Sequence, residues 1–205
     1  MFGIHGILET YGVISILVII FCETAFPVCF FFPGDTLLFS AGILASTGIL
    51  SLPMVILVTF IAATGGGITG FLIGRGLGNR FLKENTISPK MASYKHRAQH
   101  FYQTYGIWAV LIGRFVPIVR TFMSGLAGAA SMKSKTFYIT NAIGALLWSV
   151  IVPILGFFLG RKFPSLIHYM VYVVAGVVVV SFIPLVVSLY SSWRRKKQER
   201  NQTMV

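Results

Sequence analysis

The sequence predicts an all-α polytopic membrane protein, an inverted repeat with two opposed re-entrant helical hairpins and about three to four further membrane helices. The first reason is composition, because 56% of the 205 residues are hydrophobic and 11% are charged, whereas a soluble domain is about a quarter charged. The second is the presence of apolar runs long enough to cross a bilayer. The third is that two of these runs are interrupted in a similar way by charges, prolines and glycines.

The basic residues behind the net charge of +12 gather at the ends of apolar segments. One group lies between Arg75 and Arg97, and the other lies in residues 194–200. Under the positive-inside rule both groups are predicted to be cytoplasmic, where they can contact anionic headgroups. This distribution argues against a nucleic-acid partner. Residues 1–193 are predicted to form a single membrane transport domain, and residues 194–205 a basic cytoplasmic tail.

The first interrupted run follows a short apolar stretch. Residues 11–22 predict a half-span or a tilted helix, which leaves the side of the N-terminus open. Residues 24–50 are apolar but contain helix breakers, including Pro27, Pro33 and Gly34. Broken backbone at membrane depth must be covered by protein or reached by water, so this run predicts a re-entrant hairpin. Residues 52–74 then predict a full span.

The second interrupted run occupies residues 106–132 and predicts a second hairpin. Its interruptions are Arg114, Pro117 and Arg120, and a run of small residues that includes Gly125 follows them. Before it, the charged stretch from Arg75 to Tyr105 predicts a loop with an interfacial basic helix. After it, residues 136–160 and 165–190 predict two more spans, which return the chain to the cytoplasm.

The two halves resemble each other in order. The stretch YGVISILVI matches YGIWAVLIG, Asp35-Thr36 matches Arg120-Thr121, and GFLIGR matches GFFLGR. Repeat one covers about residues 11–78 and repeat two about residues 105–164, and 165–190 is a final span. If the hairpins enter from opposite sides, the repeat has inverted topology, which is typical of secondary transporters. The alternative is a chance likeness between short glycine-rich stretches.

Four charged residues fall inside the interrupted runs, namely Glu23, Asp35, Arg114 and Arg120. A charge at the bilayer centre costs about 2.5 to 3.5 kcal/mol, so they are expected to meet in one pocket. Arginine suits phosphate because its planar fork donates two parallel hydrogen bonds, so Arg114 and Arg120 are the predicted phosphate-binding residues. Glu23 and Asp35 are the predicted proton-coupling residues. The alternative is a set of buried ion pairs that only locks the hairpins together.

Other motifs are few. The predicted hairpin-shaping residues are Pro27, Pro33, Gly34, Pro117 and Gly125. His96 and His100 are spaced as metal ligands can be, but no third ligand is evident, so neither a metal nor another cofactor is expected. No nucleophile elbow, Walker loop or HExxH motif occurs, and the chain is not expected to be an enzyme.

Taken together, FPVCFFFPGDTLLFSAGILA after Glu23, then GFLIGRGLG and GRFVPIVRTFMSGLAGAASM, resemble the DedA family of membrane proteins. The resemblance covers about residues 20–165. It implies two opposed re-entrant hairpins, a location in the bacterial cytoplasmic (inner) membrane, and lipid transport. Some members resemble translocases that return undecaprenyl phosphate to the cytoplasmic face, and others are linked to phosphatidylethanolamine movement. The family's essential acids fall on Glu23 and Asp35, and its essential arginines fall on Arg114 and Arg120.

The functional hypothesis is therefore a flippase that translocates undecaprenyl phosphate or a similar anionic lipid and couples transport to protons. Its partners are the lipid phosphate, membrane lipids and protons. Phospholipid movement, including that of phosphatidylethanolamine, is one alternative. A proton-coupled carrier of a small solute is a second, and a membrane scaffold fixed by its buried charges is a third.

Overall fold

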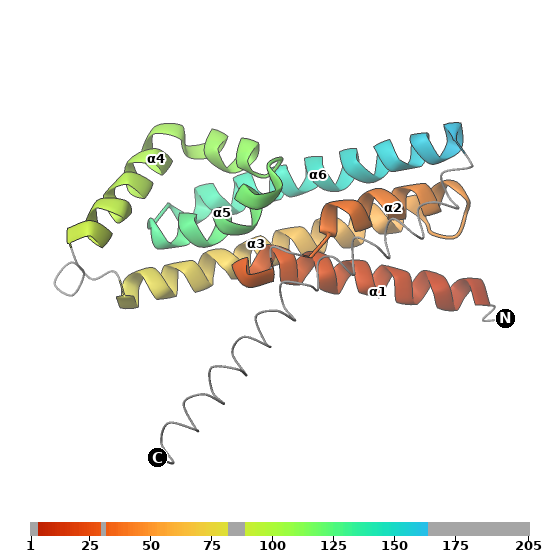
Figure 1. Ribbon diagram of the computed structural model, residues 1–205, viewed down its shortest axis with the longest axis horizontal. Coiled ribbons are helices and arrows are strands. Elements are labelled where there is room, and N and C mark those ends of the chain that lie inside the picture. The colour runs from red at the N-terminus through yellow and green to blue at the C-terminus, as the bar shows by residue number, and fades with distance from the viewer. Residues whose placement is uncertain (1–3, 30–31, 82–88, 164–205) are drawn as a thin grey trace, which may run out of the picture.

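The computed structural model describes residues 4–29, 32–81 and 89–163, and this part of the chain is all-helical (Figure 1). It contains six α-helices and one short 3-10 helix. The elements are α1 (Ile4–Ala25), η1 (Pro27–Cys29), α2 (Gly34–Ser46), α3 (Leu52–Phe81), α4 (Pro89–Gly113), α5 (Pro117–Ala129) and α6 (Ser134–Lys162).

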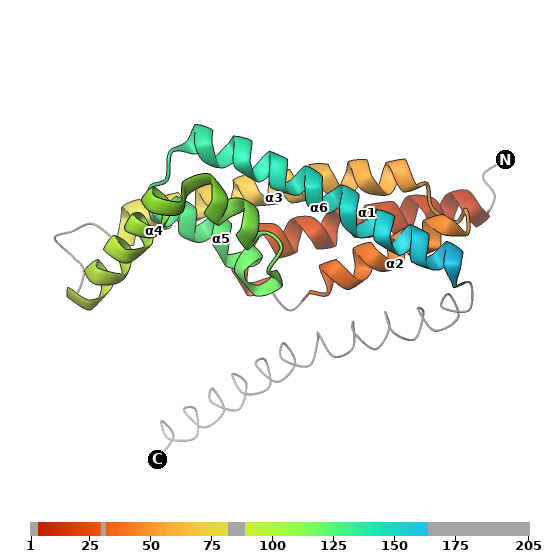
Figure 2. The same ribbon diagram turned by 90° about the horizontal axis from the view of Figure 1, so that it is seen from above.

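Two long helices form the axis of the molecule. Within the described residues, two helices are long and apolar enough to cross a membrane, Leu52–Gly78 in α3 and Ser134–Lys162 in α6. They correspond to the predicted spans 52–74 and 136–160. Helices α1 and α2 cover one half of their length, while α4 and α5 cover the other half (Figure 2). The predicted span 165–190 and the predicted tail 194–205 lie outside the described residues.

The first helix pair is broken where the sequence predicts. Helix α1 ends at Ala25, Pro27 opens η1, and α2 begins directly after Pro33. Proline lacks a backbone N–H and has a fixed φ, so it ends one helix easily and can precede the next. Helix α1 begins at Ile4 and is longer than the predicted stretch 11–22, although its apolar part is only Tyr11–Ala25.

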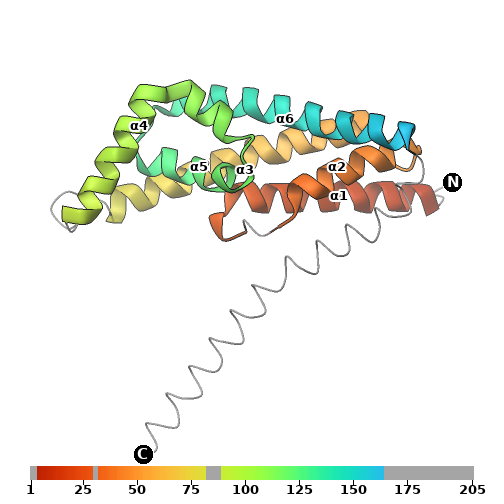
Figure 3. The ribbon, with the colours of Figure 1, turned by 45° about the horizontal axis from the view of Figure 1, so that its top comes forward.

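The second helix pair has a kink and a break. Helix α4 bends at Gly106, whose φ of 43° lies in the left-handed region that glycine tolerates best. The kink separates a basic first part from the apolar stretch Thr104–Gly113. The chain then turns, and α5 starts with Pro117 in its first turn, a position that proline favours. Helix α4 arches over α5 as a result (Figure 3).

Helix α3 is longer than predicted, because the charged loop expected to start at Arg75 is still helical to Phe81. Arg75 lies in this continuation, and its Nη1 donates a hydrogen bond to Ser134 Oγ at the start of α6. Its guanidinium also lies 5.9 Å from the centre of the Phe71 ring. Arg75 and Arg80 therefore lie on the last turns of a membrane helix and not in a loop.

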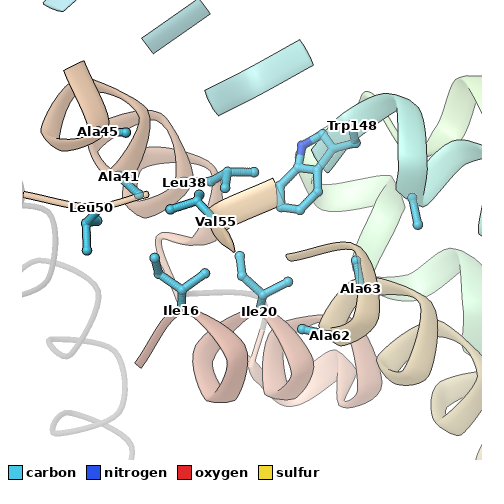
Figure 4. Packing of buried hydrophobic residues seen from close by; sticks show 11 residues of the cluster. Ile16, Ile20, Leu38, Ala41, Ala45, Leu50, Val55, Ala62, Ala63 and Trp148 are labelled. Atoms are coloured by element: carbon cyan, nitrogen blue, oxygen red, sulfur yellow. The ribbon is translucent and has the colours of Figure 1, made fainter. Parts of the chain in front are cut away.

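The apolar core joins α1, α2, α3 and α6, with Ile20, Leu38, Val55 and Trp148 among its buried residues (Figure 4). Helices in lipid associate mainly through close packing of small residues. Gly42 is an example, because a Cβ there would lie 2.2 Å from the backbone oxygen of Pro153. The Trp148 ring extends from α6 toward Leu38 (Figure 4), so the apolar core reaches the level of the two helix breaks.

Candidate functional site

The four charged residues that the sequence predicts at membrane depth come from the two breaks. Glu23 lies in the last turn of α1, and Asp35 lies in the first turn of α2. Arg114 directly follows α4, and Arg120 lies in the first turn of α5. Each break therefore supplies one residue before it and one after it, with acids on one side and arginines on the other. Arg120 thereby meets Glu23 and Asp35 across the two breaks, and Arg114 reaches the Ala63 carbonyl oxygen near the middle of α3.

Arg120 joins the two breaks through both of its terminal nitrogens. Nη2 forms an ion pair with Glu23 Oε1, and Nη1 donates to Asp35 Oδ1 over 2.7 Å. The side chains of Arg120 and Glu23 are 3% and 4% exposed, whereas that of Asp35 is 39% exposed. A buried guanidinium that spans two carboxylates replaces its lost hydration with charged hydrogen bonds. Asp35 is therefore the most exposed of these three side chains.

Trp148 supports the same cluster from α6. The Arg120 Cζ atom lies 4.3 Å from the centre of the Trp148 ring. The indole Nε1 donates to Asp35 Oδ1 over 3.0 Å, so this oxygen accepts from both an arginine and a tryptophan. A desolvated cation over an indole ring gains about 2 kcal/mol. Trp148 therefore contacts both Asp35 and Arg120 and fixes their positions relative to each other.

Arg114 is held differently, by neutral groups. Its Nη1 donates to Asn141 Oδ1 and its Nη2 donates to the Ala63 carbonyl oxygen over 3.0 Å. Asn141 in turn donates from Nδ2 to the Thr64 carbonyl oxygen over 3.1 Å. Among the described side chains, no carboxylate lies within ion-pair distance of Arg114. Arg114 is thus a buried cation, 5% exposed, without a counter-charge in this part of the chain.

A small cavity of about 10 Å³ lies between the two arginines. Its lining residues are Thr24, Val110, Arg114, Arg120, Met123, Ser124, Phe137 and Asn141. A volume of about 10 to 15 Å³ holds roughly one water molecule. Among the described residues, the buried Nε atoms of both arginines have no hydrogen-bond partner. Both arginines therefore line one small cavity, and each keeps a buried donor unpaired in this part of the chain.

The family model of the VTT domain matches residues 32–158 of this chain. The chain belongs to the DedA family. Protein DedA from Escherichia coli K12 is 36% identical over 85% of this chain and 80% of its own length. Inner membrane protein YqjA from the same organism is 33% identical over 90% of this chain and 86% of its own length. No solved structure matches the chain.

Membership of the DedA family confirms the resemblance read from the sequence motifs. The matched range contains Asp35, Arg114 and Arg120, together with their supports Asn141 and Trp148. Glu23 precedes the matched range, so its place in the cluster rests on its ion pair with Arg120.

Four of the five predicted hairpin-shaping residues of this DedA-family chain lie at the breaks. Pro27 opens η1, Pro33 precedes α2, and Gly34 and Pro117 are the first residues of α2 and α5. Gly125 instead lies inside α5. Gly34 also makes room for an acid, because a Cβ there would lie 1.8 Å from Glu23 Oε2.

The sequence did not single out Gly67 on α3. A Cβ at Gly67 would lie 2.3 Å from Asn141 Oδ1, the atom that accepts from Arg114. The glycine therefore leaves the space in which Asn141 reaches Arg114. Because the surrounding sequence, TGGGITG, is rich in glycine, nothing local marks this position as different from the others.

Proposed function

We propose that this DedA-family protein moves an anionic lipid phosphate, undecaprenyl phosphate or a similar lipid, across the bacterial cytoplasmic membrane. The observation that carries the proposal is the buried Arg114, which shares a cavity with Arg120 and has no carboxylate partner among the described side chains. An unpaired buried cation is costly, and an incoming anion removes that cost. A phosphoryl group can accept hydrogen bonds from both guanidiniums at once.

Transport in this proposal uses the two helix pairs as re-entrant hairpins that enter from opposite faces. Helices α1 and α2 belong to one repeat and α4 and α5 to the other, and Arg120 links them through Glu23 and Asp35. A cavity of about 10 Å³ is too small for a phosphate, so the described conformation is the closed one. Rocking of one repeat against the other opens the arginines to each side in turn.

Proton coupling follows from the clamp on Arg120. The two carboxylates compete with a phosphate for the same guanidinium, so a proton on either acid releases Arg120 for the lipid. Asp35 is the proposed entry point because its side chain is 39% exposed while Glu23 is 4% exposed. When the lipid leaves, loss of the proton restores the ion pairs and closes the site.

We also propose the domain organisation, the absence of a cofactor and the cellular location. Residues 1–193 act as one transport domain, with residues 194–205 as a cytoplasmic tail, and the protein works without a cofactor and without covalent chemistry. Its proposed location is the inner membrane, which is the location that the name of its relative YqjA gives for that protein.

The test measures undecaprenyl phosphate at the outer leaflet in cells that lack the protein and its paralogues. Cells that regain the wild-type chain should lose the excess lipid phosphate, whereas cells with Arg114→Gln or Arg120→Gln should keep it. Arg161→Gln is the matched control, because Arg161 lies exposed in the last turn of α6, away from the cavity. Equal surface lipid with and without the wild-type chain removes undecaprenyl phosphate as the substrate.

A second candidate, a proton-coupled carrier of a small anion, is favoured by the size of the cavity. At about 10 Å³ it is closer to a small ion than to a lipid headgroup. Flux of a soluble anion into vesicles that contain the purified chain separates the candidates. Flux that long-chain alkyl phosphates do not inhibit supports the small-anion carrier and opposes the lipid transporter.

A further inference from the structure

A second hollow lies on the apolar surface between α3 and α5. It has a volume of about 290 Å³, and its lining includes Pro27, Gly70, Ile73, Leu77, Gly125 and Leu126. Ile73, Leu77 and Leu126 are 39%, 52% and 52% exposed, so they form its open rim. We call this hollow the α3–α5 groove. The α3 residues that line the groove lie in the last part of the spanning candidate Leu52–Gly78.

Glycines bring the two helices together at the floor of the groove, and for most of them packing is a sufficient explanation. A Cβ at Gly74 would lie 2.1 Å from the Gly125 backbone oxygen, and a Cβ at Gly78 would lie 2.9 Å from Ala129 Cα. These two positions therefore need glycine for helix contact.

Gly125 itself is different. Among the described residues, a Cβ at this position would meet Pro27 Cγ at 3.9 Å and the Gly70 oxygen at 4.0 Å and nothing closer, and both are ordinary contacts. Its φ is not among the positive values, and a glycine inside a helix costs about 0.5–1 kcal/mol relative to alanine. Neither packing nor backbone geometry requires a glycine here. What the missing side chain preserves is the open volume of the groove.

The groove adjoins the arginine cavity. Gly70 lines the groove, and a Cβ there would lie 2.6 Å from Ser124 Oγ. Ser124 lines the arginine cavity and donates from Oγ to the Thr24 carbonyl oxygen over 3.4 Å. Gly70 and Ser124 are therefore neighbours, one lining the groove and the other lining the arginine cavity.

We propose that the α3–α5 groove holds the hydrocarbon chain of the lipid whose phosphate binds Arg114 and Arg120, an inference that rests on the proposed function. The groove is apolar and opens toward the bilayer, so lipid chains are the material at its mouth. Because the groove adjoins the arginine cavity at Gly70 and Ser124, a chain attached to a phosphate can occupy both sites, whereas a second protein segment would use the groove alone. A headgroup can then cross the Gly70–Ser124 contact while its chain stays in the groove.

The experiment uses the full chain in vesicles of phosphatidylethanolamine and phosphatidylglycerol. The probe is a long-chain alkyl phosphate with a diazirine in its chain, and labelled residues are mapped by mass spectrometry after irradiation. Labels should fall on Ile73, Leu77 and Leu126, and an unlabelled long-chain alkyl phosphate should remove them. Butyl phosphate, which has the headgroup but little chain, should remove far fewer.

Gly125→Leu fills the groove and should lower labelling about tenfold, which corresponds to roughly 1.4 kcal/mol of binding. Gly76→Leu is the matched control, because nothing lies within 4 Å of a Cβ at Gly76 on the same α3 helix. If Gly125→Leu does not fold, Leu126→Trp narrows the groove from its exposed rim. Both groove variants should still bind butyl phosphate as the wild type does.

Three outcomes overturn the groove proposal. They are unchanged labelling in a folded Gly125→Leu or Leu126→Trp protein, equal labelling of exposed α6 residues, and cross-links showing that residues 165–190 or a second copy of the chain cover the groove. Butyl phosphate binding that Arg114→Gln and Arg120→Gln leave unchanged sinks the proposed function instead. The two failures are therefore separate results.

Discussion

Arg120 Nη1 lies 2.7 Å from Asp35 Oδ1, although 85 positions separate the two residues in the chain. The bond joins the first turn of α5 to the first turn of α2, so it links the two halves of the molecule at their breaks. Glu23 adds the second half of the clamp. The same contact supports either a static lock or a releasable clamp, and substitutions at Arg120 distinguish them.

Arg120→Gln should destabilise the protein by about 3–5 kcal/mol, because it leaves two carboxylates without their buried partner. Chemical unfolding in detergent measures this loss. The triple variant Glu23→Gln, Asp35→Asn, Arg120→Gln removes all three charges and should recover most of the stability. A static lock predicts that the triple variant also works, whereas the proposed clamp predicts a stable protein without transport.

Arg120→Lys should keep the charge but lose transport. An ammonium is a compact point charge, whereas the two guanidinium nitrogens reach Glu23 and Asp35 separately. The measurement is lipid-phosphate transport in vesicles. Arg161→Lys is the control, because Arg161 is exposed in the last turn of α6. Full transport with lysine argues against paired hydrogen bonding to a phosphate.

The sequence indicated where charges lie at membrane depth, and it did so for a physical reason. An apolar run makes each ionised residue costly, so Glu23, Asp35, Arg114 and Arg120 stand out without any structure. The prolines marked the breaks in the same way, because a helix cannot continue through them without losing a hydrogen bond. Both signals are local. The structure has the helix breaks at the prolines and places the four charged residues beside them, while their depth in a membrane stays a prediction.

The sequence could not give the partners of each charge. Two acids and two arginines can form ion pairs in several combinations. In the structure both acids pair with Arg120, whereas Arg114 donates hydrogen bonds to Asn141 and to a backbone carbonyl oxygen. A carbonyl oxygen of a helix carries no sequence signal. The predicted end of α3 is wrong for a related reason. The helix continues past Arg75, and the hydrogen-bond partner of Arg75, Ser134, lies far away in the sequence.

Asn141→Asp tests whether the lack of a counter-charge at Arg114 matters. A carboxylate in place of the Asn141 amide would pair with Arg114 and satisfy the cation permanently. The substitution also removes the Nδ2 donor to the Thr64 carbonyl oxygen, so we expect the new ion pair to offset that loss and keep the protein folded. Binding of alkyl phosphate should be strongly reduced. Undiminished alkyl phosphate binding in this variant would show that Arg114 is not an anion ligand.

Gly67→Ala tests whether Asn141 must be placed correctly. The added Cβ would lie 2.3 Å from Asn141 Oδ1, so the amide must move away from Arg114. We expect a lower melting temperature and lower transport together, because a buried guanidinium that loses an acceptor costs about 1–3 kcal/mol or more.

Gly76→Ala is the matched control on the same helix, where a Cβ has open space. It should stabilise α3 by about 0.5–1 kcal/mol and leave transport unchanged. A lower melting temperature with unchanged transport would mean that Gly67 only packs the helix, and equal effects of the two substitutions would mean that Gly67 does not position Asn141.

Trp148 is the last part of the cluster whose role can be separated into components. Trp148→Phe keeps an aromatic face under Arg120 but removes the Nε1 donor to Asp35, whereas Trp148→Leu removes both contacts. Losing one hydrogen bond to a charged acceptor costs about 1.5–3 kcal/mol, and losing the ring contact adds about 2 kcal/mol. The free energy of unfolding should therefore be highest for the wild type, lower for Trp148→Phe and lowest for Trp148→Leu.

Because Asp35 is the proposed proton entry, Trp148→Phe should also shift the pH dependence of transport, a change that loss of packing alone does not cause. A pH profile identical to that of the wild type would restrict Trp148 to a structural role and place the control of Asp35 with Arg120 alone.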